Sequence, residues 1–263
     1  MAEFETITYG VHDAVATIEM ARPQKLNAMN AQMFTELGQA ARAAGTDPGV
    51  RVVLLKGQGK SFSAGIDVAL LGQLSGTRGA RFRTFVRTAQ LAGEWLTLME
   101  KPTVAAIHGN ALGAGFQLAL SCDLRIAADD VQLALPEVRF GIVPDLGGPF
   151  HLTRLIGPAR TKEIVWTGRT VEADEALQIG LVNRVVPAAE LAAQAEAYAR
   201  ALVHSPPIPV SLSKTLISRA HENAYEASLE AQGHAQARCI ESEDHKEAVE
   251  AFLEKRTPRF SGQ

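Results

Sequence analysis

Two turns of small residues follow short apolar strands in this chain, and both are of a kind that can hold negative charge. The first covers residues 61–67 (SFSAGID) after a strand expected at 52–55, and the second covers residues 108–117 (HGNALGAGFQ) after a strand expected at 104–107. Each turn is expected to open a helix, whose first N–H groups lack partners and whose dipole favours an anion. Two such turns can direct converging N–H donors at a single oxygen atom, which is how enzymes stabilise an oxyanion.

The segments around these turns alternate between strand and helix patterns. Residues 14–20 alternate as a half-buried strand does, and Asn30 is a candidate N-cap for a helix that the turn at residues 47–49 ends. Further short strands are expected at residues 124–127 and 132–135. Strands that alternate with helices favour an α/β fold with crossover connections.

The C-terminal part of the chain has a different pattern. Beyond Gly147 it is mostly helical, with one further strand expected at residues 181–186. A proline-rich break at residues 205–209 precedes a stretch in which every pattern is helical. We therefore expect a catalytic core of residues 1–204 and a C-terminal helical region of residues 205–263.

Composition limits the classes of function. The chain has 263 residues, 46% of them hydrophobic, which is enough for a large core. Its net charge of -3 and the lack of a basic stripe argue against a nucleic-acid partner. The two cysteines, Cys122 and Cys239, have no metal-ligand spacing, so we expect neither a metal site nor a disulfide scaffold. Without an apolar run of membrane-spanning length, we expect a cytoplasmic protein with no membrane association.

Two nucleotide-binding patterns are incomplete. Residues 57–61 (GQGKS) resemble a phosphate loop, but Leu54 stands where that motif needs glycine. Residues 113–118 begin as a dinucleotide fingerprint, but Leu118 replaces its third glycine. We therefore expect no nicotinamide cofactor.

Six motifs, in this order along the chain, resemble those of the crotonase, or enoyl-CoA hydratase/isomerase, family. They are RP with NAM (22–29), FSAGID (62–67), GNALGAG (109–115), SCD (121–123), PEV with GIVP (136–144) and AFLEKR (251–256). The resemblance extends over nearly the whole chain. It implies a crotonase-type spiral of ββα units, with C-terminal helices that mediate trimers, often paired into hexamers.

The resemblance also implies a coenzyme A thioester as the substrate. Its carbonyl oxygen would accept hydrogen bonds from the backbone N–H groups of Ile66 and Ala114. Polarising that carbonyl stabilises the enolate that forms when a proton leaves the α-carbon. Coenzyme A is then part of the substrate, and no separate cofactor is expected. Tight packing of strand against helix is the alternative explanation of both turns, because glycine and alanine serve that purpose as well.

The residues matching the acid–base positions differ from those of the family's hydratases, in which two glutamates flank the double bond. Glu137 matches one of them, but Gln117 stands at the other. An amide can position a water molecule but does not titrate near neutral pH. Asp145 stands where hydratases commonly have glycine; an aspartate there is similar to dienoyl-CoA isomerases and to the nucleophile of aryl-CoA dehalogenases. Two carboxylates in an apolar pocket have their pKa values driven apart, leaving one as base and one as acid.

We therefore expect isomerisation of the double bond of an unsaturated acyl-CoA, with Glu137 as the base, Asp145 as the second acid–base group and Gln117 as an orienting residue. A 2-enoyl-CoA hydratase of fatty-acid oxidation is one alternative. An acyl-CoA hydrolase or dehalogenase with Asp145 as nucleophile is another, and an acyl-CoA-binding protein with impaired catalysis is a third. Asp145 is also a candidate cap for the helix that opens near Gly147.

Further residues are expected to bind the coenzyme A part of the substrate. The resemblance places Ala64, Asp67 and Val68 along the path of the adenine and pantetheine groups. It also points to Phe252 and Lys255 near the C-terminus, supplied by a neighbouring subunit. Lysine suits a phosphate as a point charge, although a solvated helix end explains Lys255 equally well.

Overall fold

A six-stranded sheet forms the centre of the core, in the order β1-β2-β3-β4-β6-β9. The computed structural model describes residues 4–74, 79–220 and 225–263; residues 1–3, 75–78 and 221–224 of the two predicted regions lie outside the described residues. Strands β1 and β2 pair antiparallel, and the other neighbouring pairs are parallel. The strands are β1 (Ile7–His12), β2 (Val15–Met20), β3 (Val52–Gly57), β4 (Thr103–Ile107), β6 (Leu124–Ala128) and β9 (Arg184–Val186).

A second, three-stranded sheet includes part of the second turn, because β5 lies within residues 108–117. It consists of β5 (Asn110–Leu112), β7 (Gln132–Ala134) and β8 (Val171–Glu172), with β5 parallel and β8 antiparallel to β7. The structure confirms the strands expected at 14–20, 52–55, 104–107, 124–127 and 132–135, with small shifts at their ends. The last predicted strand is shorter than expected, and β1, β5 and β8 were not predicted.

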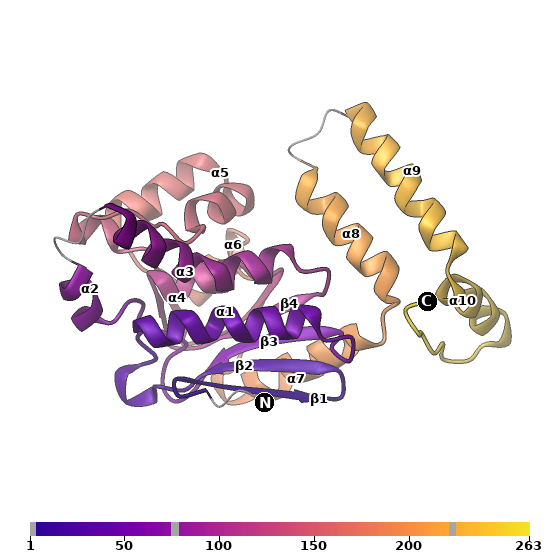
Figure 1. Ribbon diagram of the computed structural model, residues 1–263, viewed down its shortest axis with the longest axis horizontal. Helices are drawn as coiled ribbons and strands as arrows, with labels where there is room; N and C mark the ends of the chain where they lie inside the picture. The colour runs from indigo at the N-terminus through magenta and orange to yellow at the C-terminus, as the bar shows by residue number, and fades with distance from the viewer. Residues whose placement is uncertain (1–3, 75–78, 221–224) are drawn as a thin grey trace.

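Helices cover both faces of the main sheet. Helix α1 (Ala31–Thr46) packs with α3 (Gly79–Leu98) on one face, and α7 (Leu191–Val203) packs on the other (Figure 1). Along β3 the side chains alternate between the two faces of the sheet. Val53 and Leu55 belong to the hydrophobic core on the α1 face, and Val52 and Leu54 belong to the core on the α7 face. Asn30 caps α1 as predicted, its side chain accepting a hydrogen bond from the Met33 N–H at 2.9 Å.

The remaining helices frame the site and form the C-terminal region. They are α2 (Val68–Leu74), α4 (Ala114–Leu120), α5 (Gly148–Thr167), α6 (Ala173–Gln178), α8 (Pro207–Arg219), α9 (Tyr225–Glu241) and α10 (Glu243–Glu254), with three short 3-10 helices, η1 (Pro23–Lys25), η2 (Glu137–Phe140) and η3 (Ala188–Glu190). In the part of the chain that the structure describes, no helix combines the length and apolar character needed to cross a membrane.

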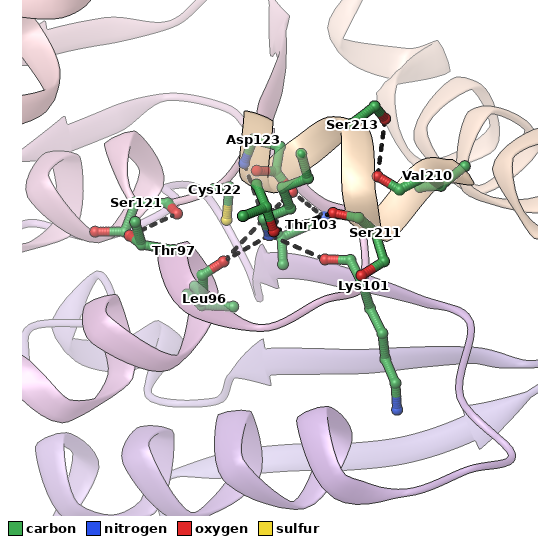
Figure 2. Close-up of polar contacts among 12 residues, drawn as sticks. Leu96, Thr97, Lys101, Thr103, Ser121, Cys122, Asp123, Val210, Ser211 and Ser213 are labelled. Carbon is green, nitrogen blue, oxygen red and sulfur yellow. Dashed lines mark hydrogen bonds and ion pairs between the residues drawn. The ribbon is translucent and has the colours of Figure 1, made fainter. Parts of the chain in front are cut away.

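The helices α8, α9 and α10 form an arm that extends away from the core (Figure 1). Lys214 of α8 fixes the base of this arm: its Nζ atom lies 2.9 Å from Asp123 Oδ2 and donates to the Lys101 carbonyl at 3.0 Å. The Thr103 N–H and hydroxyl donate to the same carboxylate oxygen. Figure 2 shows the polar contacts of Thr103 and Asp123 in this region. The arm is thus bonded to the segment that directly follows α4.

The two turns lie against each other, backbone to backbone. Ser63 forms a parallel bridge with Ala111, with the Ser63 N–H donating to the Asn110 carbonyl and the Leu112 N–H donating to the Ser63 carbonyl, each at 2.9 Å. Glycine at position 115 makes this approach feasible, because a Cβ atom there would lie 2.6 Å from Ser63 Cβ. The packing of the turns therefore depends on the absence of one side chain.

We expect Gly115→Ala to lower the free energy of unfolding by roughly 1–3 kcal/mol, because its methyl group overpacks the contact with Ser63. Gly233→Ala is the matched control: it also lies within a helix, α9, and a Cβ atom there would meet nothing within 4 Å. That control should keep or slightly raise stability. Thermal unfolding of the two variants checks this, and equal midpoints would show that the turns do not need the close contact.

Candidate active site

The first predicted donor, the Ile66 N–H, lies in the first turn just before α2. Ile66 forms an isolated parallel bridge with Met29. The Met29 N–H donates to the Gly65 carbonyl at 2.7 Å, and the Asp67 N–H donates to the Met29 carbonyl at 2.9 Å. These bonds bracket Ile66, so its own N–H points away from Met29 and has no acceptor among the described residues. The donor is therefore held by a bridge, and not at a helix start as expected.

The second predicted donor, the Ala114 N–H, is at the start of α4. Gly113 precedes it as the N-cap, with φ of 49°. The first N–H groups of a helix have no partner within the helix, and none of the described residues accepts from the Ala114 N–H. A Cβ atom on Gly65 would lie 3.7 Å from the Ala114 nitrogen, so the two donor segments are adjacent. This arrangement is compatible with the predicted oxyanion hole.

Glu137 is the first residue of η2 and is only 8% exposed. Its Oε1 atom accepts a hydrogen bond from Gln117 Nε2 at 2.8 Å, while its Oε2 atom is buried and has no partner in the described part of the chain. A Cβ atom on Gly113 would lie 3.3 Å from Oε1, which places the carboxyl group beside the start of α4. An unpaired buried acceptor is destabilising, and such atoms in native proteins call for a functional explanation.

The environment of Glu137 favours its protonated form. Burial raises the pKa of this carboxyl, and the nearby charge of Asp145 raises it further, while the hydrogen bond from Gln117 opposes the shift. A carboxyl with a raised pKa can accept and return a proton closer to neutral pH than a solvated one. These properties are compatible with the predicted role of Glu137 as the base.

Gln117 links Glu137 to the loop that carries Asp145. Its side chain is 1% exposed, and its Oε1 atom accepts from the Leu146 N–H at 2.9 Å and the Gly148 N–H at 3.1 Å. An amide oxygen has two lone pairs, and both are used here. Gln117 therefore orients two parts of the site but retains no acceptor for a water proton.

Asp145 is not the cap of α5. The N-cap of that helix is Gly147, with φ of 95° and no side-chain capping bond, so the capping interpretation is wrong. Partial burial raises the pKa of the Asp145 carboxyl. Asp145 is nevertheless exposed, so it does not share an enclosed apolar pocket with Glu137 as expected. The charge of Asp145 contributes to the raised pKa of Glu137.

Sequence analysis missed one residue near this loop. Gln90 of α3 donates from Nε2 to the Asp145 carbonyl oxygen at 2.8 Å. No motif includes this position, and a polar residue on a helix face gives no signal of a contact 55 residues away. Only the packing of α3 against the loop reveals it.

Three residues expected to bind coenzyme A lie on or next to the first turn. Ala64 is partly buried, and Val68, the first residue of α2, is 81% exposed. The Asp67 carboxylate is already engaged, because it lies 3.1 Å from the Arg22 guanidinium and accepts from the Ala69 N–H at 3.0 Å. Its role in one chain is to cap α2 and to fix the loop that carries Arg22.

The two C-terminal candidates lie far from this site in one chain. Phe252 and Lys255 are at the end of α10, on the opposite side of the molecule from α2 and α4 (Figure 1). Phe252 is 83% exposed. The structure therefore does not bring them to Glu137, and their predicted role requires a neighbouring copy.

A small apolar cavity lies behind the second donor. It has room for about one water molecule or one methyl group. Its walls come from α1, α3, α4 and the flanking loops: Met29, Phe34, Leu37, Ala89, Ala92, Gly93, Ala114, Leu118 and Leu146. Among the described residues, no cluster of three or more His, Cys, Asp or Glu side chains could hold a metal ion.

Comparison with known proteins gives matches along the whole chain. A family model described as enoyl-CoA hydratase/isomerase matches residues 10–263. The chain is 38% identical over 248 residues to a short-chain-enoyl-CoA hydratase of Clostridium acetobutylicum, covering 92% of each chain. It is 36% identical over 258 residues to a crotonyl-CoA hydratase of Syntrophomonas wolfei, covering 98% of each.

Solved structures show the same architecture. An enoyl-CoA hydratase from Bacillus anthracis superposes with a TM-score of 0.92 at 34% identity, covering 98% of this chain and 100% of that one. An enoyl-CoA hydratase subunit from Geobacillus kaustophilus gives a TM-score of 0.91 at 37% identity, with both chains fully covered. The expected α/β fold of the crotonase type is thus confirmed, and the chain belongs to the enoyl-CoA hydratase/isomerase family of enzymes.

Proposed function

We propose that this enzyme moves the double bond of an unsaturated acyl-CoA, with Glu137 as the base that removes and returns the proton. The observation that carries this proposal is the buried, unpaired Oε2 atom of Glu137 beside an amide instead of a second glutamate. An isomerase needs one base, or a pair of carboxyl groups, and no water. The amide of Gln117 and the second carboxyl group of Asp145 support this proposal.

The reaction proceeds through an enolate. Glu137 Oε2 takes a proton from the α-carbon of a 3-enoyl thioester, and the electron pair of that C–H bond moves toward the carbonyl oxygen. The N–H groups of Ile66 and Ala114 stabilise the negative charge on this oxygen. The proton returns at the γ-carbon, directly from Glu137 or after exchange with Asp145, which leaves a 2-enoyl thioester and restores the base. The proposed chemistry uses no cofactor besides the coenzyme A of the substrate.

Hydration of a 2-enoyl-CoA is the second candidate, favoured by the names of the relatives, both of which are hydratases. In that reaction Glu137 Oε2 would take a proton from water as the oxygen adds to the β-carbon, and it would then deliver that proton to the α-carbon of the enolate. The second hydrogen of Gln117 Nε2, which no described residue accepts, would donate to that water. Both lone pairs of Gln117 Oε1 are used by Leu146 and Gly148, so the amide could not share the removal of the proton.

We also propose a short acyl chain. The names of the two relatives refer to short-chain-enoyl and crotonyl substrates, and a crotonyl group has four carbons. The apolar cavity behind Ala114 supports the same inference, because it has room for about one methyl group.

We propose that the enzyme acts in the cytoplasm.

The products formed by the purified protein distinguish these reactions. We expect 3-enoyl-CoA to yield a product of unchanged mass with the ultraviolet absorption of a 2-enoyl thioester, at a rate well above that of hydration of 2-enoyl-CoA. Glu137→Gln should lower that rate by a factor of about 100 to 10,000 through loss of the base. A dominant product heavier by one water would establish the hydratase instead, and binding of acyl-CoA without turnover would rule out both enzymes.

The dependence of the rate on pH should follow the protonation of Glu137. The base acts in its ionised form, and because its pKa is raised, the rate should fall as pH decreases through a midpoint above the ordinary value of 4.5. Gln117→Met removes the hydrogen bond that opposes this shift, so its midpoint should lie at a higher pH than that of the parent. A rate profile with the same midpoint in both proteins would contradict the assignment of Glu137 as the base.

We propose that the protein assembles through its C-terminal arm into trimers or hexamers, and that a neighbouring copy supplies Phe252 and Lys255. The arm exposes large apolar side chains in a single chain, as an oligomer interface would: Ile217, Leu229, Ile240, Val249, Phe252 and Leu253. Exposed apolar surface of this kind is costly in a monomer and is covered in an assembly.

Light scattering during size-exclusion chromatography tests this assembly. We expect a mass of three or six times the 28.1 kDa of one chain. Ile240→Lys should reduce that mass, because the charge would be buried in the interface. A parent protein that elutes as a single chain would contradict the proposal, and Phe252 and Lys255 would then have no route to the site.

A further inference from the structure

The loop that carries Asp145 has no capping side chain of its own. Helix α5 begins at Gly148 behind a glycine N-cap, and no side chain of the loop bonds its first N–H groups. The Asp145 carboxyl makes no hydrogen bond to another described residue. The position of this carboxyl therefore depends on whatever holds the backbone of the loop.

Two amide side chains from two other helices hold that backbone. Gln117 of α4 accepts from the Leu146 and Gly148 N–H groups, and Gln90 of α3 donates to the Asp145 carbonyl oxygen at 2.8 Å. The contact from α3 lies at Asp145 itself, while that from α4 lies on the residues after it. Together they fix the loop at Asp145 and at the residues that follow it.

The packing of α3 brings Gln90 to this place. Ala89 and Gly93, which flank Gln90 on α3, line the small apolar cavity together with Leu146. A Cβ atom on Gly93 would lie 3.7 Å from the Leu146 carbonyl oxygen, so the helix and the loop are in close contact. Gln90 itself is partly exposed and belongs to no buried network, so its loss should leave the core intact.

We propose that Gln90 is a positioning residue, which holds the Asp145 backbone so that its carboxyl group stays within reach of Glu137 and of the substrate. The one hydrogen bond of the Gln90 side chain among the described residues goes to Asp145, so Gln90 would act through that residue. This inference rests on the role of Asp145 in the proposed function. It adds a contact from α3 to a site that the sequence motifs place on the two turns and the Asp145 loop.

A double-mutant cycle tests this proposal. Gln90→Met keeps the length of the side chain but removes the donor, and we expect it to lower kcat about tenfold while KM stays within about twofold. In an Asp145→Asn background the same change should alter kcat by less than about twofold, because its target is already lost. The control is Gln194→Met on α7, where the amide makes only a 3.5 Å contact with Glu190, and it should keep the parent rate.

The outcomes separate the inference from the function on which it rests. An unchanged kcat in Gln90→Met overturns the positioning role, as does an equal loss in both backgrounds or a loss that parallels a fall in the melting temperature. If Asp145→Asn keeps the parent kcat, Asp145 has no part in the reaction, and the proposal fails with that part of the function. If Asp145→Asn lowers kcat while Gln90→Met does not, only the positioning role fails.

Discussion

The close contact between two backbone turns is the constraint on which the rest of this structure depends. Ser63 of the first turn bonds to the backbone of β5, and a side chain at position 115 would not fit beside it. This contact brings the N–H groups of Ile66 and Ala114 onto adjacent segments. It is made by backbone atoms and small residues, so the donors are fixed by the fold and not by the choice of side chain at either position.

The buried polar atoms of Gln117 and Glu137, beside the turns, have hydrogen-bond partners with one exception. Gln117 uses both lone pairs of its oxygen and one N–H to join Glu137 to the Asp145 loop. A glutamate at position 117 would face the Glu137 carboxylate and two N–H donors at once, so one of the two carboxyl groups would have to hold a proton. The amide avoids this conflict and leaves Glu137 Oε2 as the one unpaired buried oxygen of the network. In the proposed reaction, proton exchange therefore depends mainly on Glu137.

Much of this could be predicted from the sequence, and the reasons for the rest are physical. The strands from Val52 and Thr103, the N-cap at Asn30 and the order of the motifs rest on local patterns, which the structure confirms. The strands β5 and β8 are too short to give a pattern, and β1 is mostly exposed. The bridge that orients Ile66 and the bond from Gln90 to the Asp145 carbonyl join distant parts of the chain, so no local signal marks them. The distance of Phe252 and Lys255 from the core follows from the path of the arm.

The central claim is that the two N–H groups polarise the carbonyl of a bound thioester. Isotope-edited infrared spectroscopy of a saturated acyl-CoA with a ¹³C-labelled carbonyl measures this directly, because such a ligand binds without reacting. Hydrogen bonds from Ile66 and Ala114 withdraw electron density from the C=O bond, so its stretching frequency should fall on binding, relative to the thioester in water. A bound thioester whose carbonyl frequency equals or exceeds that in water would contradict the account.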